Sequence, residues 1–175
     1  MPEQLHKEPG NFDDMRSDID TIDTLLLHNI GRAAVYLEGI DGEQANPAYA
    51  HIFGSRLTEI GAEVSSKLTE RFQLTNLVGK YKFRLEIERL EDRMLETGQS
   101  YGPEDVNVEV YAPDREKRVI ERLKELGKEA DLPLPSGFIE TFWGLLMAES
   151  CRRQRISVYA STKRYFKMHG LSKAA

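Results

Sequence analysis

The sequence predicts an all-α protein, and two observations carry this prediction. Apolar residues recur at three- and four-residue steps over most of the chain, and stretches rich in Gly and Pro separate these periodic segments. The chain has 175 residues, which corresponds to about one domain at the usual ~100–200 residues per domain. With 40% apolar and 30% charged residues, the composition is that of a globular chain and excludes a disordered or fibrous one.

Charge and composition narrow the class of function. A net charge of -5 argues against a uniformly basic surface for nucleic acid. No run approaches the ~18 apolar residues of a membrane span, and the polar start of the chain lacks the apolar segment of a secretory signal. The single cysteine, Cys151, can form no disulfide within the chain. We therefore expect a cytoplasmic protein that binds neither nucleic acid nor membranes.

The first half of the chain divides into a leader and two helical segments. Residues 1–14 are polar and predict a flexible leader. Residues 15–37 have a helical apolar period, and the breakers in 39–47 predict a loop. The period resumes over 57–94 and no proline interrupts 48–102, which predicts a very long helix. Such a helix needs partners along its whole length, which favours an elongated or intertwined assembly.

The second half predicts a connecting loop followed by two helices. Residues 98–112 contain a short alternating run with no second strand to pair with, so we expect an ordered loop. Pro113 suits the first position of a helix. Asp114 and Glu116 would then lie in the first turn, where their negative charges stabilise the positive end of the helix dipole. The most apolar segment follows, and its helix is expected to begin near Ser136, whose side chain suits an N-cap.

Two polar pairs lie on otherwise apolar helical faces. Arg71 and Lys82 are eleven positions apart, close to three turns, so they share one face of a helix. Ser150 and Gln154 are four apart and share a face of the most apolar helix. Polar groups on a face directed at the core need partners or a ligand. Taken by themselves, both pairs would also fit ordinary surface residues or polar residues with partners inside the core.

No pattern in the sequence predicts a metal, cofactor or nucleophile site. The four histidines are scattered without the spacing of metal ligands, and no glycine-rich phosphate-binding motif is present. Cys151 has no nearby histidine to activate it, which favours a small buried apolar residue over a nucleophile. We therefore expect neither a metal nor a cofactor.

Residues 113–154 resemble the second half of the AroQ-type, all-helical chorismate mutases. In that family an Asp-Arg-Glu motif opens the second helix, and a Ser-x-x-x-Gln pair lies on the third. The matching residues here are Asp114, Arg115, Glu116, Ser150 and Gln154. Residues 68–82 are similar to the central part of the family's long first helix, where an arginine and a lysine lie eleven apart, as Arg71 and Lys82 do.

The resemblance implies a fold and an activity. The fold would be a chorismate-mutase-type bundle of long helices, intertwined as a homodimer. The activity would be the rearrangement of chorismate, a small dianion, to prephenate in the shikimate pathway of aromatic amino acid biosynthesis, without a cofactor.

The resemblance also implies a role for each matching residue. Lys82 and Gln154 would converge on the breaking ether oxygen, which gains negative charge in the transition state. Arg71 would hold a carboxylate, because the guanidinium fork matches the two carboxylate oxygens. Ser150 would donate a hydrogen bond to a carboxylate. The ring end of the substrate would be bound by Arg115 and Glu116, with Glu116 accepting a hydrogen bond from the ring hydroxyl.

The start of the chain departs from the family. The family supplies one more arginine, from near the start of its first helix, to the site of the other protomer. Arg16 lies in a segment similar to the family's opening but 55 residues before Arg71, which is too far. Arg56 lies 15 residues before Arg71, nearly the right distance, in a segment without that pattern. The sequence leaves both candidates open, and we expect one helical domain over 15–175 in which 15–53 form an extra helix and loop.

Two further departures leave alternatives of function open. Ala112 stands where many members of the family carry an aspartate, and the connection 83–112 is longer than usual. An isochorismate-pyruvate lyase or an aminodeoxychorismate mutase would share the scaffold, although Glu116 favours the mutase because the lyases tend to be apolar there. A non-catalytic helical module that binds a regulator or a partner is the alternative outside enzymes.

Overall fold

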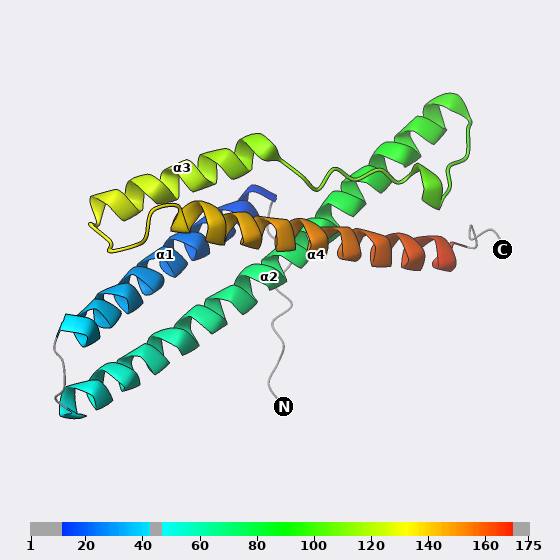
Figure 1. The fold of residues 1–175 in the computed structure, drawn as a ribbon. Coiled ribbons are helices and arrows are strands. Elements are labelled where there is room, and N and C mark those ends of the chain that lie inside the picture. The colour runs from blue at the N-terminus through cyan, green and yellow to red at the C-terminus, as the bar shows by residue number, and fades with distance from the viewer. Residues whose placement is uncertain (1–11, 43–46, 170–175) are drawn as a thin grey trace.

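The computed structural model describes residues 12–42 and 47–169, which form four α-helices (Figure 1). They are α1 (Phe12–Gly42), α2 (Pro47–Thr97), α3 (Pro113–Glu129) and α4 (Phe138–Met168), and a short 3-10 helix, η1 (Pro103–Asp105), interrupts the connection from α2 to α3. The described residues contain no strand, so the all-α prediction is confirmed. None of these helices is long and apolar enough to cross a lipid bilayer.

The first helix begins earlier than the sequence predicts. α1 begins at Phe12, inside the predicted leader 1–14, because Asp13 and Asp14 fill its first turn and stabilise the positive end of the helix dipole. The remaining part of that leader, residues 1–11, lies outside the described residues.

The predicted loop 39–47 is shorter in the structure. The helical backbone of α1 continues to Gly42, and α2 begins at Pro47. Proline suits the first position of a helix, because the backbone N–H that proline lacks would have no partner within the helix at that position. Residues 43–46 lie outside the described residues. The segment 15–53, predicted as an extra helix and loop, is therefore divided between α1 and the start of α2.

The prediction of Ser136 as the N-cap of the last helix is wrong. The N-cap is Gly137, whose φ of 77° lies in the left-handed region that glycine adopts without a steric penalty. Its carbonyl accepts the first helical hydrogen bond, from Thr141 N at 3.1 Å. No side chain caps this helix, so the tight turn before it, rather than a serine hydroxyl, sets where α4 begins.

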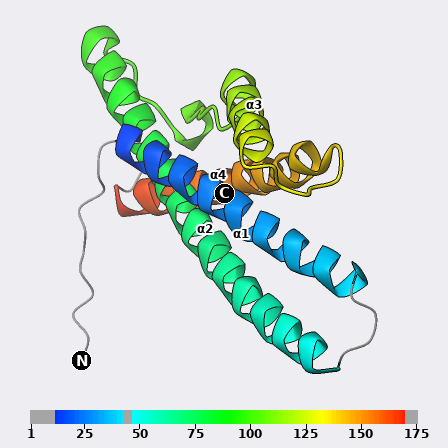
Figure 2. The same ribbon diagram turned by 90° about the vertical axis from the view of Figure 1, so that its left-hand side faces the viewer.

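The helices do not form a simple four-helix bundle, because α1 pairs with α2 and α4 crosses α2. α1 packs antiparallel along the first half of α2, and this pair extends beyond α3 and α4 (Figures 1 and 2). α4 packs across the second half of α2, while α3 contacts both α1 and α4. The connection 98–112 runs back along α2 to the start of α3 (Figure 1). The long α2 thus has a helical partner on each of its halves within one chain.

Two hydrophobic clusters hold these helices together. The first joins α1, α3 and α4, with partly buried side chains of α2 packed against it, and the second joins the far halves of α2 and α4. Burial of this apolar surface is the main stabilising contribution. The first cluster consists of Ile22, Leu26, Leu27, Val119, Leu123, Ile139, Trp143, Leu146 and Met147. The second cluster consists of Phe83, Ile87, Leu90 and Phe166.

A glycine sets the distance between α2 and α4 where they cross. A Cβ atom on Gly79 would lie 3.0 Å from the Cα and the carbonyl oxygen of Gln154 and 3.0 Å from the Cβ of Ser157, which is too close. Ser157 Oγ also donates to the carbonyl of Asn76 at 3.0 Å across the same crossing. Gly79 therefore costs some helix propensity but allows the close approach that brings Gln154 near the part of α2 that carries Lys82.

Leu26 and Leu25 test whether α1 is part of the core. The Leu26 side chain is 0% exposed in the first cluster, whereas its neighbour Leu25 is 41% exposed. We expect Leu26→Ala to lower the free energy of unfolding by about 2–5 kcal/mol because it leaves a cavity. Leu25→Ala is the matched control and should cost less than about 1 kcal/mol. Urea unfolding followed by circular dichroism measures both, and equal small losses would contradict the packing of α1.

Candidate functional site

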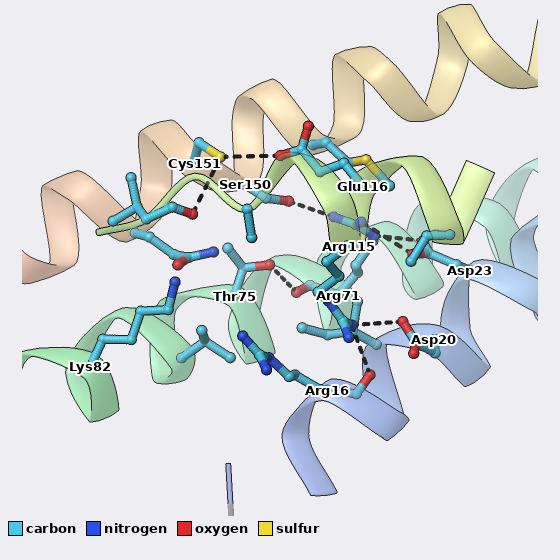
Figure 3. Close-up of a pocket in the computed structure, with 17 residues that line it drawn as sticks. Arg16, Asp20, Asp23, Arg71, Thr75, Lys82, Arg115, Glu116, Ser150 and Cys151 are labelled. Atoms are coloured by element: carbon cyan, nitrogen blue, oxygen red, sulfur yellow. Dashed lines mark hydrogen bonds and ion pairs between the residues drawn. The ribbon is translucent and has the colours of Figure 1, made fainter. Parts of the chain in front are cut away.

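A pocket lies between the helices at the level where α2 crosses α4 (Figure 3). All four helices and the connection before α3 contribute to its lining. Along α2 and α4 the lining residues fall between the two hydrophobic clusters, so apolar packing on both sides fixes the pocket. The polar lining residues are Arg16, Asp20, Asp23, Arg71, Thr75, Lys82, Arg115, Glu116, Ser150, Cys151 and Gln154.

Seven of the eight site residues predicted from the sequence line this one pocket. They come from positions as far apart as Arg16 and Gln154, and the fold brings them together. The structure does not bring Arg56 to it. Arg56 is exposed on the first half of α2, where its Nη1 donates to Glu59 Oε2 at 2.8 Å. Within one chain, the structure therefore places Arg16 and not Arg56 at the pocket.

Arg71 is the most deeply buried cation of the pocket, with 3% of its surface exposed. Its Nε donates to Asp23 Oδ1 at 2.7 Å and its Nη2 donates to Asp23 Oδ2 at 3.2 Å. Its Nη1 donates to the hydroxyl oxygen of Ser150. The Ser150 hydroxyl in turn donates to the carbonyl of Leu146 at 2.7 Å, so its single proton is already used.

A second ion pair joins α1 to α3 at the rim of the pocket. Arg115 Nη2 donates to Asp20 Oδ1 at 2.7 Å, and both side chains are partly exposed. Arg16 lies one turn before Asp20 on α1, and its guanidinium lies over the ring of Phe12, 4.0 Å from the ring centre. Burial, and then the nearby charge of Arg115, lower the pKa of Arg16.

Lys82 and Gln154 line the pocket from α2 and α4. Lys82 Nζ donates to the backbone carbonyl of Glu109 at 2.9 Å. Burial is the main cause that lowers the pKa of Lys82, and the positive charge of Arg16 lowers it further. The amide oxygen of Gln154 is buried and has no hydrogen-bond partner among the described residues. A buried polar atom without a partner is costly, so this amide is a group that a ligand could satisfy.

Glu116 of α3 and Cys151 of α4 contact each other in the lining of the pocket. Cys151 Sγ donates to Glu116 Oε1 at 3.7 Å, and burial raises the pKa of the Glu116 carboxyl. Burial, followed by the charge of Glu116, raises the pKa of the Cys151 thiol, which therefore stays protonated at neutral pH. A protonated thiol is a weak nucleophile. Cys151 is, however, only partly buried and lines the pocket, whereas the sequence predicts a buried apolar residue there.

The pocket carries an excess of positive charge. Four cations and three carboxylates line it, which leaves one net positive charge when all three carboxylates are ionised. A pocket of this charge, rich in N–H donors, suits a small anion with two carboxylates. The cations are Arg16, Arg71, Lys82 and Arg115, and the carboxylates are Asp20, Asp23 and Glu116.

Two aspartates of α1 line the pocket although the sequence did not predict them as site residues. Asp20 and Asp23 follow Arg16 by four and seven residues, so all three lie on one face of α1. This spacing was a usable signal, but which helix that face contacts depends on tertiary packing. Among the described residues, no group of three or more His, Cys, Asp or Glu side chains could hold a metal ion.

Comparison with known proteins agrees with the geometry of the pocket. The family model described as chorismate mutase type II matches residues 55–155, which include α3, most of α2 and the part of α4 that lines the pocket. No curated protein and no solved structure matches the chain. α1 lies outside the matched residues, although it contributes Arg16, Asp20 and Asp23 to the pocket. The match extends over more than half of the chain, and the protein belongs to the chorismate mutase type II family.

Proposed function

We propose that this protein is a chorismate mutase that rearranges chorismate to prephenate. The observation that carries the proposal is the gathering of four cationic side chains, from three helices of one chain, around a single pocket. Membership of the family makes this reaction the first one to consider for such a pocket.

The enzyme can accelerate this reaction by binding and electrostatic stabilisation, without forming a covalent bond to the substrate. Chorismate is a dianion that rearranges by a pericyclic shift, with no covalent intermediate and no proton transfer. The enzyme must hold the reactive chair conformation and stabilise the charge that develops on the breaking ether oxygen. A pocket that excludes much of the water strengthens each such interaction.

We assign the carboxylates and the ring of the substrate to the arginines and Glu116. Arg71 and Arg16 would each bind a carboxylate, while Arg115 and Glu116 would bind the ring end, with Glu116 hydrogen bonded to the ring hydroxyl. Ser150 is better suited to an indirect role than to the direct donation expected from the sequence. Its only proton goes to Leu146, and its oxygen accepts from Arg71, so it would act by orienting Arg71.

We assign the ether oxygen to Lys82 and Gln154. The ammonium group of Lys82 has three donors, and its hydrogen bond to the exposed Glu109 segment leaves two of them for a ligand. Gln154 would donate from its amide nitrogen, because its amide oxygen, the buried atom without a partner, can only accept. Both would stabilise the transition state more than the bound substrate, because the oxygen gains charge only as the bond breaks.

A homodimer stays a prediction, and the proposed site does not depend on it. The cross-protomer arginine was the reason for expecting a shared site. Arg16 of the same chain lines the pocket, so one chain supplies every group assigned above.

The test is a spectrophotometric assay of chorismate consumption by the purified chain, with prephenate identified as the product. Incubation with isochorismate and detection of salicylate would indicate the lyase instead. Conversion of aminodeoxychorismate, with chorismate untouched, would indicate the amino-substrate mutase. A chain that neither turns over these substrates nor binds a bicyclic dicarboxylate mimic of the transition state would be a non-catalytic module, and the proposal would be wrong.

The ether-oxygen donors can be tested by removing each one. We expect Lys82→Ala and Gln154→Ala each to lower kcat by about 100- to 1000-fold, the usual loss when one donor to a developing negative charge is removed. Lys80→Ala is the matched control, since Lys80 is exposed on the same helix, and it should keep the wild-type rate. Steady-state kinetics with chorismate measures the three variants. Near-normal rates in both donor variants would refute this assignment.

Arg16 and Arg56 can be distinguished in the same assay. We expect Arg16→Ala to lower kcat/KM by about 10- to 100-fold, the range for loss of a hydrogen bond to a charged group. Arg56→Ala should leave kcat/KM unchanged, because Arg56 lies on the surface beside Glu59. The specific activity of the wild type should also stay constant on dilution below the concentration at which any dimer dissociates. A large loss in Arg56→Ala, or activity that falls on dilution, would instead indicate a site shared between two chains.

The lowered pKa of Lys82 predicts where activity is lost at alkaline pH. Lys82 must be protonated to donate, so kcat/KM should fall as the pH rises through its pKa. Because burial and Arg16 lower that pKa, the midpoint should lie below the ordinary lysine value of 10.5. The profile of Cys151→Ala is the control for titration of the thiol. The alkaline loss should persist there with a midpoint no higher than in the wild type, because the negative charge of Cys151 raises the pKa of Lys82. An alkaline midpoint that disappears in Cys151→Ala would contradict the assignment to Lys82.

A further inference from the structure

We propose that Asp23 is a positioning residue that holds the guanidinium of Arg71 in the orientation that binds a substrate carboxylate. The inference rests on the proposed function, and it concerns a residue of α1, outside the part of the chain that the family model matches. Asp23 itself would not touch the substrate.

Asp23 and Arg71 form a buried pair with two hydrogen bonds. Asp23 is 1% exposed and accepts two hydrogen bonds from Arg71, one from Nε and one from Nη2. Both of its oxygens are used, so the carboxylate fixes the plane of the guanidinium as well as its charge. Ser150 accepts from the remaining nitrogen, Nη1, from the side of α4 (Figure 3).

Arg71 keeps N–H donors that neither Asp23 nor Ser150 uses. A guanidinium has five N–H groups, and Asp23 and Ser150 together take three of them. One N–H therefore remains on each of Nη1 and Nη2. These two nitrogens form an edge that matches a carboxylate in a bidentate manner. Asp23 uses the Nε–Nη2 edge, so a ligand that takes only the remaining hydrogens of Nη1 and Nη2 would not displace it.

Stability alone does not account for the buried pair of Asp23 and Arg71. A buried ion pair contributes little net stability, and an apolar pair of similar size would often serve the fold as well. An arginine that must bind an anion is a different case, because its charge has to be kept inside the protein while the pocket is empty. A resident carboxylate on the edge that the ligand does not use meets both needs.

The competing explanation is that Asp23 only neutralises the charge of Arg71. The two explanations predict different effects on substrate affinity. If neutralisation were the only role, removing the negative charge would leave the pocket more positive and lower the KM for a dianion. If orientation matters, the loss of the two fixed hydrogen bonds raises KM, even where the charge is retained.

Two substitutions separate these explanations. Asp23→Asn removes the charge and one hydrogen bond, and Asp23→Glu keeps the charge but moves the carboxylate. We expect both to raise the KM for chorismate by about tenfold or more, with a smaller change in kcat, because the binding interaction contributes in both the ground state and the transition state. Asp18→Asn is the matched control, since Asp18 is exposed on the same helix, and it should keep the wild-type KM. An unchanged or lower KM in Asp23→Asn, or a wild-type KM in Asp23→Glu, would overturn the proposal.

A spectroscopic measurement follows Arg71 itself and does not depend on turnover. Rotation of its guanidinium about the Cζ–Nε bond can be followed by nitrogen NMR, with the signals assigned through Arg71→Lys. We expect slower rotation in the wild type than in Asp23→Asn, because two hydrogen bonds must break before the group can turn. Equal rotation rates would overturn the proposal even if KM changed through some loss of folding, which thermal unfolding of each variant would reveal.

Binding of the bicyclic dicarboxylate distinguishes failure of this inference from failure of the proposed function. If the wild type binds this probe but does not convert chorismate, the proposed function is wrong, and the probe's dissociation constants in the variants still test Asp23. The expected result is then a tenfold or greater weakening in both Asp23 variants. If the wild type neither binds the probe nor turns over chorismate, both the proposed function and the inference are overturned.

Discussion

The structure of the pocket depends on keeping arginine side chains charged and ordered in a partly desolvated interior before a ligand arrives. An isolated buried charge is strongly unfavourable, and a flexible one would bind weakly because its side chain must be ordered on binding. α1 meets this constraint with two aspartates three positions apart. Asp23 pairs with Arg71 and Asp20 pairs with Arg115, so one face of one helix fixes cations on two others.

The hydrophobic clusters make such a polar layer possible. They lie on either side of it, along both α2 and α4, so the stability of the helix packing does not have to come from the charged residues. The crossing at Gly79 holds the two helices at a fixed short distance within this layer. Because side chains on close-packed helices keep their positions, Lys82 and Gln154 can be aligned without direct bonds to each other.

The features that the sequence could predict are local ones. Periodicity identifies the helices, and helical geometry alone puts Arg71 with Lys82, and Ser150 with Gln154, on shared faces. The contacts between helices could not be read in this way, since Asp20 and Asp23 resemble solvent-exposed acids until α1 is known to pack against α2 and α3. Gly79 is a similar case, because a glycine that weakens an isolated helix can be required where two helices cross. The choice between Arg16 and Arg56 depended on the same unknown packing.

The position of α1 also bears on why an intertwined assembly was expected. A helix as long as α2 exposes apolar surface along its length, and the family's arrangement supplies an arginine from a second chain. Here α1, a segment outside the family match, packs antiparallel along the first half of α2 and brings an arginine to the pocket from the same chain, while Leu85 and Leu95 in the second half of α2 stay exposed. A helix joined by a short connection has a far higher effective concentration than a separate chain, so its docking does not depend on protein concentration. Within one chain, this N-terminal helix supplies Arg16, Asp20 and Asp23 to the pocket.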